Sequence, residues 1–282
     1  MAESWKIDEV QRNVHVLRFQ RAKEWWMLLL SDVHWDNIHC DRALIKRHLD
    51  QAKDRKAVVT CAGDFFCAMQ GRWDKRASKS DLRPELQTEN YLDALVDQAA
   101  EWLLPYKDIL GVWGDGNHET GIVKRHETNI ADRLCDRMRS MGSQVRHGGY
   151  CGWIRLRFTE PGGRHPEDML LFYHHGAGAD PAVTKGQIEQ ERMAAWLRGA
   201  DIVHTGHIHQ HTYTRTMSVS LSCANKVVIK PIHWIRSGSY IDSYQAGGYH
   251  IERNRGPRPM GGWWVKFSVR NHQIVTEVTA TD

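Results

Sequence analysis

Five short motifs in this 282-residue chain carry the side-chain types that bind metal ions and transfer protons. Each motif follows an apolar run and contains Asp, Asn or His. In chain order they are Ser31-Asp32-Val33-His34, Gly63-Asp64, Gly116-Asn117-His118-Glu119, His174-His175-Gly176 and Gly206-His207-Ile208-His209. Carboxylate oxygens, amide oxygens and imidazole nitrogens bind divalent metals, and imidazole exchanges protons near neutral pH. The motifs therefore indicate metal-dependent acid–base chemistry.

Each motif taken alone has a simpler, structural explanation. An Asp after a strand is often a turn residue or a helix cap, and a single His is more often a hydrogen-bonded structural group than a ligand. The five motifs together are harder to explain in this way, because each stands at the end of a predicted strand. Ligands of α/β sheets bind beyond the carboxyl ends of the strands, so five strands would bring these side chains to one edge.

The elements that must position the motifs follow from the apolar pattern. Apolar runs predict strands, and apolar residues at helical spacing predict helices. The expected strands are 25–30, 57–62, 109–113, 169–173 and 201–205, and the expected helices are 41–52, 84–104, 129–141 and 186–199. After residue 210 a run of strands follows. This order predicts an α/β fold, a two-sheet β-sandwich flanked by helices, in a single domain that spans residues 1–282.

The composition, with 41% hydrophobic and 26% charged residues, favours a soluble globular protein. A formal net charge of +4 permits an anionic partner without requiring one. The six cysteines form no CxxC pair, so we expect buried thiols of a reducing compartment rather than a zinc knuckle. The first residues lack a signal pattern, and the longest apolar run, 25–30, is too short to cross a bilayer. We therefore expect a cytoplasmic protein with no membrane partner.

The order of the five motifs resembles that of the calcineurin-like metallophosphoesterase superfamily, which includes phage-encoded members. The resemblance covers residues 28–209. It implies two mixed β-sheets flanked by helices, a site for two metal ions, and hydrolysis of phosphomonoesters or phosphodiesters. Two cations about 3.5–4 Å apart neutralise the charge of the phosphate, lower the pKa of a bound water, and hold nucleophile and leaving group in line.

By the same resemblance, seven side chains hold the two metal ions. They are Asp32, His34 and His209 for the first ion, Asn117, His175 and His207 for the second, and Asp64 as the bridge. Asp32 and His34 are two residues apart in an expected extended segment, so both side chains would leave the same face. His174 is the alternative to His175, and the glycine that the family places after this histidine favours His175. Nitrogen and oxygen donors suit Mn, the ion that we predict, as well as Fe, Zn or Ni.

His118 and Glu119 are the expected catalytic residues. In the family, the position of His118 touches the substrate phosphate and helps protonate the leaving oxygen. We expect Glu119 to hydrogen-bond His118, to fix its tautomer and to favour its protonated form. Asp115 stands where the family commonly has an apolar residue. Its expected role is a turn cap, and the alternative is that it tunes the residues that surround the metal ligands.

The chain has further residues that are candidates for contacting the substrate. The basic segment 70–83 surrounds an aromatic ring with cations, which suits nucleic-acid phosphates and a stacked base, although a solvated surface loop explains it equally well. A second basic segment, 250–262, is a weaker candidate. Glu127 and Thr128 read as the start of a helix, with Thr128 or Asn129 as its cap. The predicted substrate contacts are Arg72, Trp73, Lys75 and Arg76, together with Arg125 and His126, which follow the catalytic turn.

The leading hypothesis is a two-metal-dependent hydrolase of phosphate esters, a phosphodiesterase or nuclease that acts on nucleic acid or nucleotides. A phosphomonoesterase, including one of the Ser/Thr protein phosphatase type, would share every metal ligand and is the main alternative. A non-catalytic binding scaffold of the same fold is a minor alternative, because such a protein should have lost ligands. The sequence does not address the oligomeric state.

Overall fold

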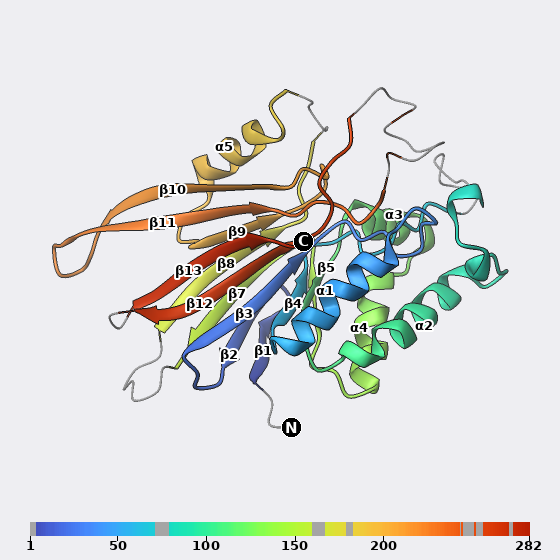
Figure 1. Ribbon diagram of the computed structural model, residues 1–282, viewed down its shortest axis with the longest axis horizontal. Helices are drawn as coiled ribbons and strands as arrows, with labels where there is room; N and C mark the ends of the chain where they lie inside the picture. The colour runs from blue at the N-terminus through green and yellow to red at the C-terminus, as the bar shows by residue number, and fades with distance from the viewer. Residues whose placement is uncertain are drawn as a thin grey trace.

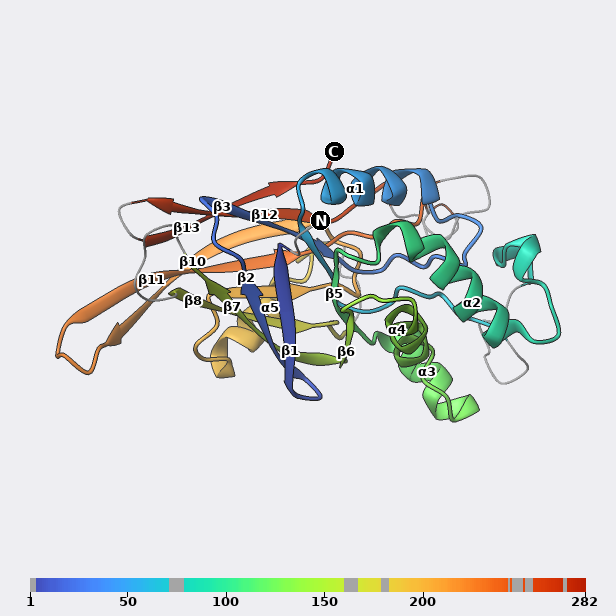
Figure 2. The ribbon, with the colours of Figure 1, turned by 90° about the horizontal axis from the view of Figure 1, so that it is seen from below.

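Two mixed β-sheets pack face to face, and helices cover their outer faces (Figure 1, Figure 2). The structure is a computed structural model that describes residues 4–70, 79–159, 167–178, 183–242, 244, 251, 256–270 and 273–282. Helices lie outside both sheets, so the layers follow the order helix, sheet, sheet, helix. The predicted fold class is therefore confirmed.

The seven-stranded sheet combines the first two strands of the chain with strands from its second half. Its order is β1-β2-β7-β8-β9-β11-β10. Pairs β2–β7, β8–β9 and β9–β11 are parallel, and the other pairs are antiparallel. The strands are β1 (Trp5–Gln11), β2 (Val14–Phe19), β7 (Cys151–Phe158), β8 (Glu167–His174), β9 (Ile202–Thr205), β10 (Thr212–Leu221) and β11 (Val227–Arg236).

The six-stranded sheet has the order β13-β12-β3-β4-β5-β6. Its strands from β3 to β6 run parallel, and the hairpin of β12 and β13 adds two antiparallel strands at one edge. The strands are β3 (Glu24–Leu30), β4 (Val58–Cys61), β5 (Leu110–Gly114), β6 (Arg146–Gly149), β12 (Trp263–Arg270) and β13 (Gln273–Ala280). Three parallel strands, β3, β4 and β5, therefore end side by side.

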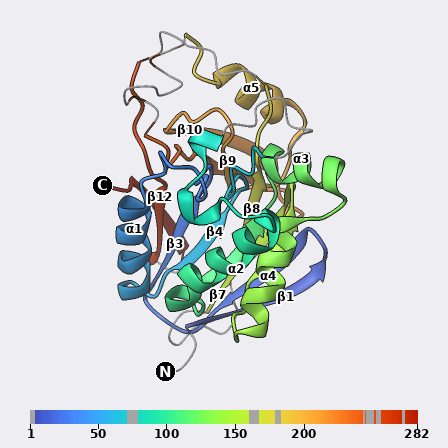
Figure 3. The same ribbon diagram turned by 90° about the vertical axis from the view of Figure 1, so that its right-hand side faces the viewer.

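Helices α1, α2 and α4 cover the outer face of the six-stranded sheet, and α5 covers the other sheet. In the view of Figure 3, α3 lies between α5 and the pair of α2 and α4. No helix in the described part of the chain is long and apolar enough to cross a membrane. The helices are α1 (Arg42–Asp54), α2 (Tyr91–Leu103), α3 (Asn117–His126), α4 (Ile130–Ser140) and α5 (Gln187–Trp196), with short 3-10 turns at Lys79–Asp81, Pro84–Leu86 and Leu104–Tyr106.

The alternation along β3 shows how the core is divided. Trp25, Met27 and Leu29 face the layer between the sheets, whereas Leu28 and Leu30 face the helices. Successive side chains of a strand point to opposite faces. A strand that is covered on both faces reads as a continuous apolar run, which is why β3 was predictable from the sequence. Burial on both sides holds the ends of β3, β4 and β5 in place.

Some element boundaries differ from the prediction. The helix expected over 84–104 begins only at Tyr91, and Pro84 starts a separate 3-10 turn. The carbonyl of Asn90 accepts hydrogen bonds from the amides of Asp93 and Ala94, which marks the true start of α2. Strands β1, β2, β6 and β7 were not predicted, and α3 was not either, since its sequence NHETGIVKRH has few apolar residues to show a helical period.

Three buried histidines of the seven-stranded sheet predict how stability depends on pH. Burial lowers the pKa of His15 and His233 to about 4 and that of His204 to about 3. Because these folded pKa values lie below the unfolded value, their contribution is present above pH 6.5 and is lost as the pH falls toward 4. We expect the melting temperature of chelator-treated protein to fall by on the order of 10 °C between pH 7.5 and 4.5.

Differential scanning calorimetry across this pH range measures the effect. A His204→Gln variant should show a shallower decline, because one of the three titrating groups is gone. Equal melting temperatures of the wild type at both pH values would contradict the assignment of neutral, buried imidazoles.

Candidate active site

All five motifs stand at the ends of parallel strands, mostly in the loop that follows, whereas Asn117, His118 and Glu119 form the first turn of helix α3. The first three follow β3, β4 and β5 of one sheet, and the last two follow β8 and β9 of the other. The amide of Asp32 donates to the carbonyl of Gly63 at 3.0 Å, which joins neighbouring loops within one sheet. The amide of His207 donates to Asp32 Oδ2 at 2.8 Å and joins the loops of the two sheets. The sheet ends therefore form one site.

Asp32, His34 and His209 form the first cluster of possible metal ligands. The Nε2 atoms of the two histidines face each other at 3.3 Å, and Asp32 Oδ1 lies 3.3 Å from His209 Nε2 and 4.0 Å from His34 Nε2. Asp32 is fully buried, yet its Oδ1 has no well-formed hydrogen bond to any described residue. An orphaned carboxylate oxygen beside two converging imidazoles fits a divalent cation.

Asp64, His175 and His207 form the second cluster. His175 Nε2 lies 3.1 Å from Asp64 Oδ2. The side-chain oxygen of Asn117, Oδ1, lies 3.1 Å from His175 Nε2 and 2.7 Å from His207 Nδ1. Asn117, the first residue of α3, thus points its oxygen at two imidazoles. The structure brings all seven predicted metal ligands together in two neighbouring clusters.

The other ring nitrogens of the second cluster are held by backbone carbonyls. His175 Nδ1 lies 2.9 Å from the carbonyl of Ala62, and His207 Nε2 lies 3.0 Å from that of Gly178. A ring nitrogen that donates to a carbonyl directs the other ring nitrogen into the cluster, where it can bind a metal ion in place of a proton, as for a metal-binding histidine. His174 belongs to neither cluster, because its Nδ1 accepts from the amide of Gly176 at 2.9 Å.

Five of the clustered residues have an unusual backbone conformation. The φ angles of Asp32, His34, Asp64, His207 and His209 lie between 50° and 73°, in the left-handed region. Non-glycine residues adopt this region at an energetic cost, and such residues gather at functional sites. The expectation that Asp32 and His34 lie in an extended segment is therefore wrong. Their side chains converge because each residue turns the backbone, not because of strand alternation.

The charges of the second cluster balance within the protein. Burial alone would raise the pKa of Asp64, but the positive charges of His175 and His118 hold it well below its usual range. Burial alone would lower the pKa of His175, but Asp64 outweighs it and raises that pKa to about 10. In the first cluster, the interactions of Asp32 with His209 outweigh burial and hold its pKa at about 2. A cation that binds beside Asp64 would take the place of a proton.

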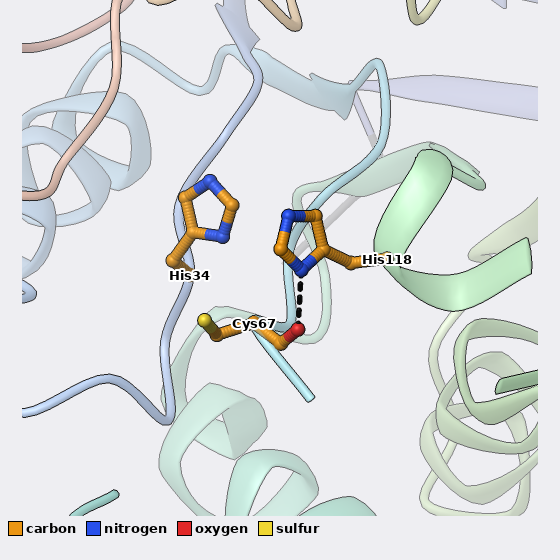
Figure 4. A group of neighbouring side chains, drawn as sticks. All are labelled: His34, Cys67 and His118. Carbon is orange, nitrogen blue, oxygen red and sulfur yellow. Dashed lines mark hydrogen bonds between the residues drawn. The ribbon is translucent and has the colours of Figure 1, made fainter. Parts of the chain in front are cut away.

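Cys67 lies beside the site and is the one thiol in a possible metal group among the described residues, together with His34 and His118 (Figure 4). Burial raises the pKa of this thiol well above its usual value, so the thiolate that a metal needs is disfavoured. Its carbonyl, not its sulfur, contacts His118. The two clusters of nitrogen and oxygen donors therefore remain the fitting metal sites.

His118 occupies the first turn of α3 and faces the clusters. Its Nδ1 donates to the carbonyl of Cys67 at 2.5 Å, and its Nε2 lies 3.7 Å from Asp64 Oδ2. The rings of His118 and His34 meet edge to face, with centroids 4.9 Å apart. The predicted orienting bond from Glu119 is therefore wrong: the carbonyl of Cys67 fixes the tautomer of His118.

Glu119 instead joins the loop that follows β4 to the turn before α3 through hydrogen bonds to backbone amides. Its side chain is fully buried, and its carboxylate accepts from the amides of Asp64 at 3.0 Å, Gly116 at 2.8 Å and Phe66 at 2.9 Å. Burial raises its pKa well above the usual value. The side chain leaves α3 on a different side from His118, so it supports the loop that carries Asp64. Glu119 is thus a positioning residue.

The Glu119→Gln variant is expected to be markedly less stable. A glutamine of the same shape turns an NH₂ group toward at least one of the three amides, and that donor stays unpaired. The free energy of unfolding should fall by about 2–3 kcal/mol. Chemical denaturation measures this loss, with Glu101→Gln on the exposed face of α2 as the matched control. Equal stability of both variants would show that Glu119 does not support the loop.

The predicted substrate contacts are only partly placed. Arg72, Trp73, Lys75 and Arg76 lie outside the described residues. Arg125 is exposed in the last turn of α3. His126 lines a cavity of about 800 Å³ together with Tyr91, Arg133 and other residues. His126 and His118 are eight residues apart on one helix, or about 12 Å, so they cannot contact one small phosphate ester together.

The segment 126–128 ends helix α3 and precedes helix α4. Glu127, expected at a helix start, instead ends α3 with a left-handed φ of 54°. Asn129 caps α4 by accepting from the amide of Asp132 at 2.9 Å, as predicted. Asp115 is not a turn cap, since its carboxylate accepts from Asn129 Nδ2 and lies 2.8 Å from His147 Nε2.

Two further residues contact the site and were missed as site residues. Arg258, from the weaker basic segment, donates to the carbonyl of Ile208 at 2.6 Å, between two metal-ligand candidates. The hydroxyl of Tyr150 donates to the carbonyl of Gly176 at 2.8 Å, and its ring meets that of His175. Neither residue stands in a motif, and only the fold brings them to the site.

No known family profile matches the chain, and no curated protein is significantly similar to it. Among solved structures, Vacuolar Protein Sorting 29 from Cryptosporidium parvum has a TM-score of 0.40 and 13% identity, over 92% of this chain and 99% of that one. A predicted phosphoesterase from Streptococcus pneumoniae TIGR4 has a TM-score of 0.34 and 12% identity, over 92% and 99%. A candidate 5′-nucleotidase from Staphylococcus aureus has a TM-score of 0.41 and 12% identity, over 91% of this chain and 53% of that one.

The arrangement of the described residues shows where the five motifs lie. Two mixed sheets are flanked by helices, and the five motifs follow parallel strands in the predicted order. Their side chains form two clusters that fit divalent metal ions. The two-sheet fold and the placement of the five motifs are therefore those expected from the resemblance to the calcineurin-like metallophosphoesterase superfamily.

Proposed function

We propose that this protein is a two-metal-dependent hydrolase of phosphate esters and that its substrate is a phosphodiester in a nucleotide or nucleic acid. One observation supports the proposal most. Two neighbouring clusters of nitrogen and oxygen donors, centred on Asp32 and Asp64, are complete and adjoin the ring of His118. A non-catalytic scaffold would have no reason to keep both clusters and the five costly left-handed residues.

In the proposed reaction, the seven ligands would hold two divalent ions, with Mn as the ion that we expect. Two such ions neutralise phosphate charge and activate a water for in-line attack. The protein's own part is to aim its donors before substrate arrives. The carbonyls of Ala62 and Gly178 hold the imidazoles of His175 and His207, and Asp64 Oδ1 accepts from the amide of His118 at 2.9 Å. Positioning of this kind lowers the cost of reaching the transition state.

His118 is the proposed general acid. Its Nδ1–H is committed to the carbonyl of Cys67, so Nε2 is the atom that can give a proton to the leaving oxygen. The side chain of His118 is one-tenth exposed, so a substrate can reach it although its neighbours are buried. In this proposal, Glu119 acts indirectly by fixing the loop of Asp64.

The preference for a diester rests on charge and space. The net charge of +4 and the basic last turn of α3, with Lys124 and Arg125, suit a polyanion. In this proposal, the cavity of about 800 Å³ that His126 lines, at the other end of α3 from His118, would hold the part of a longer substrate that extends beyond the metal clusters. A phosphomonoesterase would use the same ligands, so substrate tests must decide between the two.

A substrate panel tests this proposal. The protein, loaded with Mn²⁺, is assayed against single-stranded DNA, RNA, duplex DNA, cyclic nucleotides and a phosphopeptide. We expect hydrolysis of one or more of the diesters at rates well above that of the phosphopeptide. Preference for the phosphopeptide would overturn the diester assignment and favour a protein phosphatase.

A further inference from the structure

A second cavity, of about 290 Å³, lies between α5 and the outer face of the seven-stranded sheet. Helix α5 covers this face near β8, β9 and β11. His174 and His175 are consecutive, and they serve opposite sides of the sheet end. His175 belongs to the metal clusters, whereas His174 lines this cavity. The cavity therefore lies next to the candidate active site but is separate from it.

The walls of the cavity are mainly aromatic and apolar. His174, Trp196 and Trp234 line it, and Met193 and Val203 add aliphatic surface. Trp234 is almost fully buried, whereas Trp196 is 60% exposed at the end of α5. A large exposed tryptophan at the rim of a small apolar cavity is suited to close over a flat ring, since aromatic pairs gain from stacked or edge contacts.

Three polar atoms of the cavity residues have no hydrogen-bond partner in the described part of the chain, although the charges of Arg236 and Glu189 attract each other. The three atoms are Arg236 Nε, Gln190 Nε2 and Glu189 Oε2, all of which are buried. Arg236 is 7% exposed and is held rigidly, because its terminal nitrogens donate to the carbonyls of Lys185 and Gly186. Buried polar atoms nearly always have partners. A ligand that carries both acceptors and donors could supply the hydrogen bonds that these two donors and one acceptor lack.

The cavity shares part of its wall with the metal-ligand loops. Gly176 follows His175, and Gly206 precedes His207. The carbonyl of Gly178 accepts from His207 Nε2 at 3.0 Å, so this residue lines the cavity and orients a metal-ligand candidate. Residues that line the cavity therefore adjoin or orient metal-ligand candidates.

We propose that this cavity binds a planar heteroaromatic ring with hydrogen-bonding edges, namely the base of the nucleotide on which the metal site acts. Aromatic walls with a few polar atoms are how proteins hold an unstacked nucleobase. That the ring belongs to the substrate rests on the proposed function. A free nucleoside would offer the same chemistry from another source.

Isothermal titration calorimetry with adenosine, guanosine, cytidine and uridine tests the cavity itself. Nucleosides have no phosphate, so their binding does not depend on the metal site or on hydrolysis. We expect at least one of them to bind the metal-free protein, and the Trp196→Ala variant to bind it at least tenfold more weakly. Ile188→Ala is the matched control, since Ile188 is an exposed apolar residue of the same helix outside the cavity.

A second pair of variants tests the hydrogen-bonding edge. Glu189→Gln should change which nucleoside binds best, because the acceptor becomes a group that can also donate. Glu191→Gln, an exposed neighbour on α5, should have no effect. Absence of binding by all four nucleosides, or equal weakening by Ile188→Ala and Trp196→Ala, would overturn the cavity assignment.

The source of the ring is tested with the corresponding nucleoside monophosphate and Mn²⁺-loaded protein. If base and phosphate belong to one ligand, the monophosphate should bind at least tenfold more tightly than the nucleoside. Equal affinity would overturn the claim that the ring is part of the substrate. Nucleoside binding without any phosphoester hydrolysis would instead contradict the proposed function and support the cavity assignment.

Discussion

The Asp64→Asn variant is expected to lose metal binding and to lose at least a thousandfold in turnover. Asp64 is 2% exposed, and its Oδ2 faces His175 Nε2 at 3.1 Å while its Oδ1 accepts from the amide of His118. An amide in this place keeps the shape but removes the negative charge that two cations would share. Bridging carboxylates hold neighbouring cations together, so both sites should weaken at once.

Asp115→Asn is the matched control for this variant. Asp115 is also a buried aspartate, two residues before Asn117, but its partners are Asn129 and His147 rather than the metal clusters. Inductively coupled plasma mass spectrometry after dialysis measures the metal content of both variants. The control should keep its metal, and Asp64→Asn should not. Full metal content in Asp64→Asn would mean that this carboxylate is not a ligand.

The His118→Ala variant is expected to keep its metal and to lose between about a hundredfold and ten-thousandfold in turnover, the range that general acid–base groups contribute. The His118 ring is hydrogen-bonded to the carbonyl of Cys67, and its Nε2 lies 3.7 Å from Asp64 Oδ2, which is too far for a hydrogen bond to that ligand candidate. The loss should depend on the leaving group. A p-nitrophenolate leaves without a proton, whereas the alkoxide of a natural ester needs one, so the natural substrate should suffer more.

His126→Ala serves as the control on the same helix. Its position, about two turns from His118, predicts unchanged metal content and at most weaker binding of long substrates, seen as a higher KM. Steady-state kinetics with p-nitrophenyl and nucleotide esters separates the two variants. Loss of metal from His118→Ala, or an equal defect with both leaving groups, would show that His118 is not the acid.

The strand ends explain why the sequence could predict that the candidate ligands lie together, whereas their assignment to two metal ions came from the family resemblance. Strands β3, β4 and β5 are apolar on both faces, so their boundaries are plain, and parallel neighbours must end together. Asp32, Asp64 and Asn117 stand directly after these boundaries. Gly63 and Gly116 also indicate that these loops lie close together, since a Cβ at either position would come within 2.6 Å of the facing loop. Tight loops of this kind leave little freedom in where the ligands lie.

What the sequence did not reveal depends on contacts between distant segments. The left-handed backbone of Asp32 and His34 has no local signature, because these residue types only tolerate this conformation. Glu119 adjoins His118 in sequence, which suggested a bond, but helical geometry sends adjacent side chains in different directions. Arg258 reaches the site from a segment 50 residues after Ile208. The sequence did not predict helix α3, because its mostly polar residues show no apolar period. Several of these polar residues belong to the candidate site.

Titration of the chelator-treated protein with Mn²⁺, while hydrolysis of bis(p-nitrophenyl) phosphate is followed, tests the central claim most directly. The account predicts that activity rises with added metal and saturates at two bound ions per chain, the number that the clusters of Asp32 and Asp64 can hold. Hydrolysis that is already maximal without metal, or metal-saturated protein that hydrolyses no phosphoester, would contradict it.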